Sequence, residues 1–149
     1  MGILVDKGYE ITLNEYEADV ALVNTCGFIE SAKEEAISNI LEMAELKETG
    51  NLKALVVSGC LSQRYKDEIL DSFPEVDAVV GVFDFDKIDE IINNTLKGKR
   101  ACYLDSEKLE NFNNMPRIQT TPFYTAYLKI AEGCDNHCSY CAIPKIRGR

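Results

Sequence analysis

Short and nearly unbroken apolar runs alternate with helical patterns along the first hundred residues. The runs are Val-Ala-Leu-Val at 20–23, Ala-Leu-Val-Val at 54–57 and Ala-Val-Val at 78–80. Such runs are typical of parallel strands that are covered on both faces. Each run is followed by apolar residues at helical spacing. The pattern therefore predicts an α/β domain built on a doubly wound parallel sheet.

Local signals set the ends of the predicted helices. Ser31 and Glu34 resemble a capping box, and apolar residues then recur at helical spacing to about residue 48. The second helix can begin at Ser62 and must stop at Pro74, since proline cannot continue a helix. The third runs from about residue 84 and is terminated by Gly98. We interpret the apolar stripes of these helices as core faces.

The periodicity is lost after the third predicted helix. We divide the chain into an amino-terminal domain at 1–99, a linker at 100–122 and the start of a second domain at 123–149. Alternating residues from Tyr124 to Ala131 predict a first strand for that second domain. Only 27 residues follow Pro122, whereas an eight-fold barrel needs about 200.

Three cysteines lie within eight residues of the predicted second domain: Cys134, Cys138 and Cys141, in the string GCDNHCSYC. A 4Fe-4S cluster normally takes four thiolates, so this spacing leaves one iron open to an exchangeable ligand. A zinc site is the alternative. It would need an outside ligand, because the only histidine, His137, is adjacent to Cys138 and the two could hardly reach one tetrahedral ion. We find no apolar leader that would favour disulfides.

Two further cysteines follow predicted strands. Cys26 comes three residues after Val23, and Cys60 comes three residues after Val57. The carboxyl ends of parallel strands lie at one edge of a sheet, where ligands bind in open α/β folds, so we expect the two thiols to converge. The alternative is a pair of buried structural cysteines. Cys102 has no such placement, and we assign it to structure.

Composition narrows the class of protein. The chain has 149 residues, 46% of them hydrophobic, which is enough for one core, and no apolar run is long enough to span a membrane. We therefore expect a soluble, cytoplasmic chain. The net charge is -9, and residues 123–149 hold four of the sixteen basic residues but only two of the twenty-five acidic ones. The acidic charge of residues 1–122 argues against direct binding of nucleic acid by this chain.

Three separated motifs resemble one enzyme family. Asn24-Thr25-Cys26, the stretch SGCLSQR at 58–64 and the loop LKIAEGCDNHCSYCAIPKIRG are similar to motifs of the radical S-adenosylmethionine (SAM) methylthiotransferases, in the same order. The resemblance covers essentially the whole chain. It implies a flavodoxin-like amino-terminal domain that lacks its first strand here, followed by the first strand and cluster loop of a TIM-type barrel.

The resemblance also implies a chemistry. Cys134, Cys138 and Cys141 would hold a 4Fe-4S cluster that binds SAM and generates a 5'-deoxyadenosyl radical. Cys26, Cys60 and a third cysteine that is missing from this chain would hold a second 4Fe-4S cluster, which supplies sulfur. A second SAM would supply the methyl group, and a donor such as flavodoxin the electrons.

The substrate follows from finer detail. The residues around Cys26 and at 142–148 resemble the corresponding residues of family members that modify the β-carbon of an aspartate in ribosomal protein S-twelve of the small ribosomal subunit. The alternatives are tRNA adenosine methylthiolation and a non-catalytic iron–sulfur or zinc-binding module. The resemblance implies a fragment truncated at both ends, inactive by itself.

Overall fold

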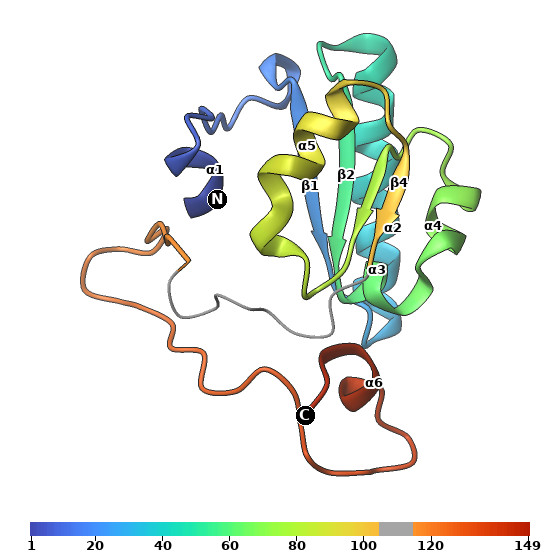
Figure 1. The fold of residues 1–149 in the computed structure, drawn as a ribbon, viewed down its shortest axis with the longest axis vertical. Coiled ribbons are helices and arrows are strands. Elements are labelled where there is room, and N and C mark those ends of the chain that lie inside the picture. The colour runs from blue at the N-terminus through green and yellow to red at the C-terminus, as the bar shows by residue number, and fades with distance from the viewer. Residues whose placement is uncertain (105–114) are drawn as a thin grey trace.

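The computed structural model describes residues 1–104 and 115–149. Its centre is one sheet of four strands in the spatial order β1-β2-β3-β4, and every neighbouring pair is parallel. The strands are β1 (Val20–Thr25), β2 (Ala54–Gly59), β3 (Ala78–Val80) and β4 (Ala101–Tyr103) (Figure 1). The parallel α/β sheet predicted from the apolar runs is confirmed.

Helices cover both faces of the sheet (Figure 1). Side chains of α2 (Glu30–Thr49), α3 (Cys60–Tyr65) and α4 (Asp67–Ser72) pack on one face. Side chains of α1 (Gly2–Asp6) and α5 (Ile88–Leu96) pack on the other. The remaining elements are η1 (Glu15–Glu17), η2 (Phe85–Lys87) and α6 (Ile143–Arg147). The connection through α5 thus crosses the face opposite to the other two crossovers.

The two central strands are buried on both sides. Leu55, Val57 and Val79 belong to the cluster beneath α2, and the alternate residues Val56 and Val80 belong to the cluster beneath α5. All five side chains are fully buried. Because both faces are buried, the sequences of these strands are unbroken apolar runs and do not alternate between apolar and polar residues.

Several boundaries differ from the sequence prediction. The capping box predicted at Ser31 and Glu34 does not form, since α2 begins at Glu30 and its N-cap, Ile29, makes no side-chain hydrogen bond. The predicted second helix is two helices, α3 and α4, which are separated by Lys66 with a positive φ of 48°. Tyr65 and Ile69 still pack in the same cluster on both sides of the break, so the apolar spacing carries no sign of it. Residues 101–103, predicted as part of the linker, form the edge strand β4. Part of the predicted linker, residues 105–114, lies outside the described residues.

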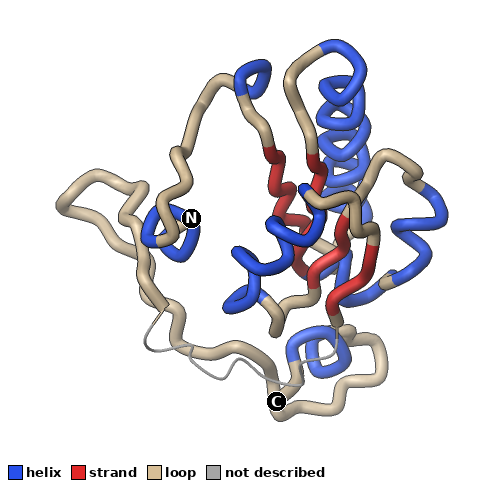
Figure 2. Tube along the Cα trace, turned by 45° about the horizontal axis from the view of Figure 1, so that its top comes forward, coloured by secondary structure: helices blue, strands red, loops and turns tan. Residues whose placement is uncertain are grey.

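The predicted strand at 124–131 is wrong. This segment has no regular structure, and its large side chains are exposed, among them Tyr127 at 89% and Ile130 at 89%. In Figure 2 the tan tube of this segment runs outside the sheet. A strand is stable only when its backbone pairs with a neighbouring strand, and none of the described strands pairs with this segment.

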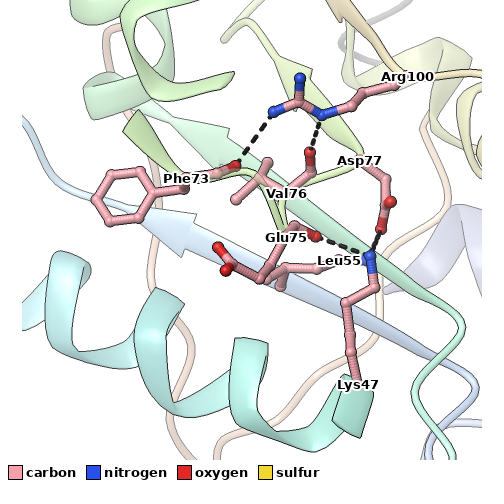
Figure 3. A network of polar contacts seen from close by, with 7 residues as sticks. All are labelled: Lys47, Leu55, Phe73, Glu75, Val76, Asp77 and Arg100. Carbon is pink, nitrogen blue, oxygen red and sulfur yellow. Dashed lines mark hydrogen bonds and ion pairs between the residues drawn. The ribbon is translucent and has the colours of Figure 1, made fainter. Parts of the chain in front are cut away.

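A polar network fastens the end of α2 to the start of β3 (Figure 3). Lys47 donates to the Glu75 carbonyl at 2.8 Å and pairs with the Asp77 carboxylate at 2.6 Å. The same carboxylate accepts from the buried Leu55 amide at 2.8 Å. On the other side of the loop, Arg100 donates to the carbonyls of Val76 at 2.8 Å and Phe73 at 3.2 Å. These contacts hold the entry into β3.

Replacing Asp77 with alanine is expected to lower the free energy of unfolding by about 2–3 kcal/mol, because the Leu55 amide and the Lys47 ammonium then lose a charged acceptor inside the protein. Urea unfolding measures this loss. Lys53→Met is the control: its ion pair with Asp19 is more than half exposed on both sides and should contribute less than about 1 kcal/mol. Equal losses in the two variants would contradict the role of Asp77.

The described residues include no helix that is both long enough and apolar enough to cross a membrane.

Candidate functional site

Cys26 and Cys60 lie at the same edge of the sheet. In the register of β1 and β2, Thr25 is opposite Gly59, so the two cysteines directly follow paired residues. The loops also touch: a Cβ atom added to Gly27 would lie 2.9 Å from the carbonyl oxygen of Cys60. The structure therefore brings these two predicted site residues together at the carboxyl edge. Cys60 is 4% exposed, and Cys26 is partly exposed.

Glycine makes this close approach possible. Gly59 has a φ of +101°, which L side chains rarely adopt, and a Cβ there would lie 2.4 Å from the Thr25 carbonyl oxygen. Because β1 and β2 are this close where they end, only a residue without a side chain fits between Ser58 and Cys60. Gly27 and Gly59 therefore allow the Cys26 and Cys60 loops to approach each other this closely.

Polar residues of the second motif hold the neighbouring loops. Arg64 donates to the Gly27 carbonyl at 2.8 Å, which fixes the loop after Cys26. Gln63 accepts from the Val82 amide at 3.0 Å, which fixes the loop after β3. No structural role was predicted for these two residues. Their position, three and four residues after Cys60, which itself follows a predicted strand, is the signal that could have revealed one.

The carboxyl-terminal cysteines lie on a loop that closes on itself. The Cys134 amide donates to the Gly148 carbonyl at 3.1 Å, and the Cys141 amide donates to the Cys138 carbonyl at 3.1 Å. Gly148 has a positive φ of 73°. Cys138 is exposed, whereas Cys134 and Cys141 are partly buried. The loop is therefore bound to the residue after α6 at Cys134 and turns tightly between Cys138 and Cys141, while the Cys138 side chain is exposed.

This loop is docked beside Cys60 through α6. Ile146, which is 2% exposed, forms a small apolar cluster with Cys60 and Val82. The Arg147 Nε atom lies 3.3 Å from the Cys60 sulfur, within hydrogen-bonding distance. In both the ribbon of Figure 1 and the tube of Figure 2, α6 lies below the carboxyl edge of the sheet. The two predicted groups of cysteines thus belong to one end of the molecule.

The three loop cysteines are not gathered around a single point. Across residues 1–104 and 115–149, no three Cys, His, Asp or Glu side chains are placed to bind one metal ion. All six cysteines are free thiols, and His137 is in contact with Arg149 at 2.9 Å between ring and guanidinium nitrogens. The donor set fits an iron–sulfur cluster chemically, since thiols dominate it. Binding one requires the loop to draw its sulfurs together.

The environment of Cys102 differs from that of the other cysteines. It sits on β4 and packs against the core beneath α2. Burial, followed by a hydrogen bond to Asp67, raises the pKa of its thiol from 9.0 to about 12. This environment agrees with the structural assignment made from the sequence.

Iodoacetamide at pH 8 is expected to modify Cys102 at least roughly tenfold more slowly than exposed Cys138, because the thiolate is the reactive form. The raised pKa also makes the free energy of unfolding depend on pH. The stability that comes from keeping the Cys102 thiol protonated is fully present below pH 9 and is lost as the pH rises toward about 12. Mass spectrometry of labelled peptides measures the rates, and Cys102→Ala should flatten the alkaline fall in stability. Equal labelling of Cys102 and Cys138 would contradict the partly buried placement of Cys102 against the core.

The fold and site together define a class: a parallel α/β domain with cysteine loops at the carboxyl edge of its sheet and a three-cysteine loop docked beside them. The chain belongs to the Uncharacterized protein family UPF0004, whose family model matches residues 1–81. It is similar to proteins named ribosomal protein uS12 methylthiotransferase RimO. It is 52% identical to the one from Lachnoclostridium phytofermentans over 99% of the chain, and 50% identical to the one from Clostridioides difficile over 100%. The chain spans 34% of the length of each. The resemblance to methylthiotransferases is confirmed.

Proposed function

We propose that this chain is part of a radical-SAM methylthiotransferase that acts on ribosomal protein uS12. The observation that carries the proposal is the meeting of the Cys26 and Cys60 loops at one sheet edge, with the three-cysteine loop docked beside Cys60. The names of the similar proteins support the substrate. The acidic charge of the chain is more compatible with a protein substrate than with tRNA.

Each group of cysteines has a role in this proposal. Cys134, Cys138 and Cys141 hold a 4Fe-4S cluster, and Cys26 and Cys60 contribute to a second one. When bound, the first cluster would supply the electron for reductive cleavage of SAM, so that a hydrogen can be taken from the aspartate β-carbon; the second cluster would supply the sulfur, and a second SAM the methyl group, that replace it. The chain itself contributes the thiolates, the close approach of the two strand ends and the attachment of the loop to the sheet edge. Residues 123–149 begin the radical-SAM domain.

Spectroscopy on the chain tests the cluster. After anaerobic reconstitution we expect about four irons per chain on the three-cysteine loop, with additional iron only if Cys26 and Cys60 retain some. The electron paramagnetic resonance spectrum of the reduced sample should change when SAM is added. Zinc in place of iron, or a spectrum indifferent to SAM, would favour a non-catalytic metal-binding module.

A chimera tests the substrate. The matching 149 residues of the Lachnoclostridium phytofermentans relative are replaced by this chain, and the product is incubated with SAM, reductant and either uS12 or tRNA. We expect uS12 to gain the mass of one methylthio group. The unaltered relative is the positive control. Modification of tRNA alone would make tRNA the substrate, and modification of neither would overturn the methylthiotransferase proposal.

A further inference from the structure

Arg147 contacts both a site cysteine and the segment that leads into the three-cysteine loop. It is the last residue of α6, and its Nε atom lies 3.3 Å from the sulfur of Cys60, the first residue of α3. Its Nη1 atom pairs with the Glu132 carboxylate at 3.1 Å. Glu132 lies two residues before Cys134 and also pairs with Lys129. One guanidinium therefore joins three segments that are distant in sequence.

The contact is partly shielded from water. The side chains of Arg147 and Glu132 are 23% and 24% exposed, and Cys60 is 4% exposed. Charge-assisted hydrogen bonds of the planar guanidinium are directional, and they are stronger where solvent is limited. The neighbouring Ile146 adds an apolar contact with Cys60, whereas the guanidinium of Arg147 contacts both Cys60 and Glu132. Arg147 is thus the residue that connects both.

We propose that Arg147 is a positioning residue that clamps the three-cysteine loop onto the Cys60 edge, acting through Cys60 and Glu132. The role of the cysteines as cluster ligands rests on the proposed function, whereas the contacts of Arg147 with Cys60 and Glu132 form without a metal. By fixing both ends of this connection, Arg147 sets the separation between the two groups of cysteines.

The chain offers a matched comparison. Arg147→Met removes both polar contacts at similar length, and Arg147→Lys keeps the charge and can still pair with Glu132, but loses the forked geometry. Arg149→Met is the control, because Arg149 is two residues away and contacts His137, and among the described residues no hydrogen bond joins it to Cys60. Two readouts on the metal-free chain are used: amide hydrogen exchange, and alkylation of Cys60 relative to Cys26.

In Arg147→Met we expect exchange at the Cys134 and Ile146 amides to accelerate about tenfold to a hundredfold, while the amides of β2 keep their protection. Alkylation of Cys60 should rise by a similar factor, while alkylation of Cys26 is unchanged. Arg147→Lys should restore part of the protection. Arg149→Met should behave like the native chain.

Unchanged exchange and unchanged Cys60 labelling in Arg147→Met would overturn the clamp, as would equal effects of Arg147→Met and Arg149→Met. Iron binding separates this inference from the proposed function. If the native chain takes up no iron but Arg147→Met loosens the loop, the clamp stands and the cluster proposal fails. If iron binds with a SAM response but Arg147→Met is indistinguishable from native, the proposed function stands and the clamp fails.

Discussion

Replacing Cys138 with alanine is expected to reduce the iron on the reconstituted loop from about four atoms per chain to less than about one, and to abolish the spectral response to SAM. Cys138 is exposed and lies between Cys134, whose amide donates to the Gly148 carbonyl, and Cys141. Without it only two thiolates remain, too few to hold a four-iron cluster. Iron and sulfide analysis and electron paramagnetic resonance measure the two losses.

The matched control is Cys102→Ala, which removes a thiol from β4 without touching the loop. It should retain the native iron content and the native response to SAM. Retention of a SAM-responsive cluster in the Cys138 variant would show that the ligands lie elsewhere in the chain. Loss of iron in the Cys102 variant with intact folding would likewise contradict the assignment of Cys102 to structure.

The parts of the fold that follow from local periodicity could be predicted from the sequence. Strands β1 to β3 are apolar on both faces, and that requirement appears directly in the run of residues 54–57. The approach of Cys26 and Cys60 follows from the same property, since parallel neighbours end at one edge. These predictions needed only the strand assignments and the general rules of parallel sheets.

Features set by tertiary contacts could not be predicted. The break at Lys66 does not disturb the apolar spacing. Strand β4 is only three residues long and lies at the edge of the sheet, where its side chains are partly buried, so it lacks the unbroken apolar run of a strand that is buried on both faces. At 124–131 the alternating pattern was misleading, because strand formation also needs a pairing neighbour. The contact of Arg147 with Cys60 joins residues 87 positions apart, and no local pattern encodes it.

Replacing Gly59 with alanine is expected to lower the free energy of unfolding by about 2–6 kcal/mol. The backbone at φ +101° strains any residue with a Cβ, which costs about 1–3 kcal/mol. The new methyl group would also lie 2.4 Å from the Thr25 carbonyl oxygen, and relieving that overlap requires β1 and β2 to separate where they end, at a further cost of about 1–3 kcal/mol. Urea unfolding measures the sum.

Gly98→Ala isolates the first of these two terms. Gly98 has a similar φ of +85°, but an added Cβ would meet nothing within 4 Å, so this variant should lose only about 1–3 kcal/mol. The difference between the variants is therefore the cost of separating the Cys26 and Cys60 loops. Since Gly59 immediately precedes Cys60, the same separation should lower any iron retained by these two cysteines while leaving the three-cysteine loop loaded. Equal losses of stability in the two variants would mean that the loops part freely, and close contact between them could then no longer explain a shared site.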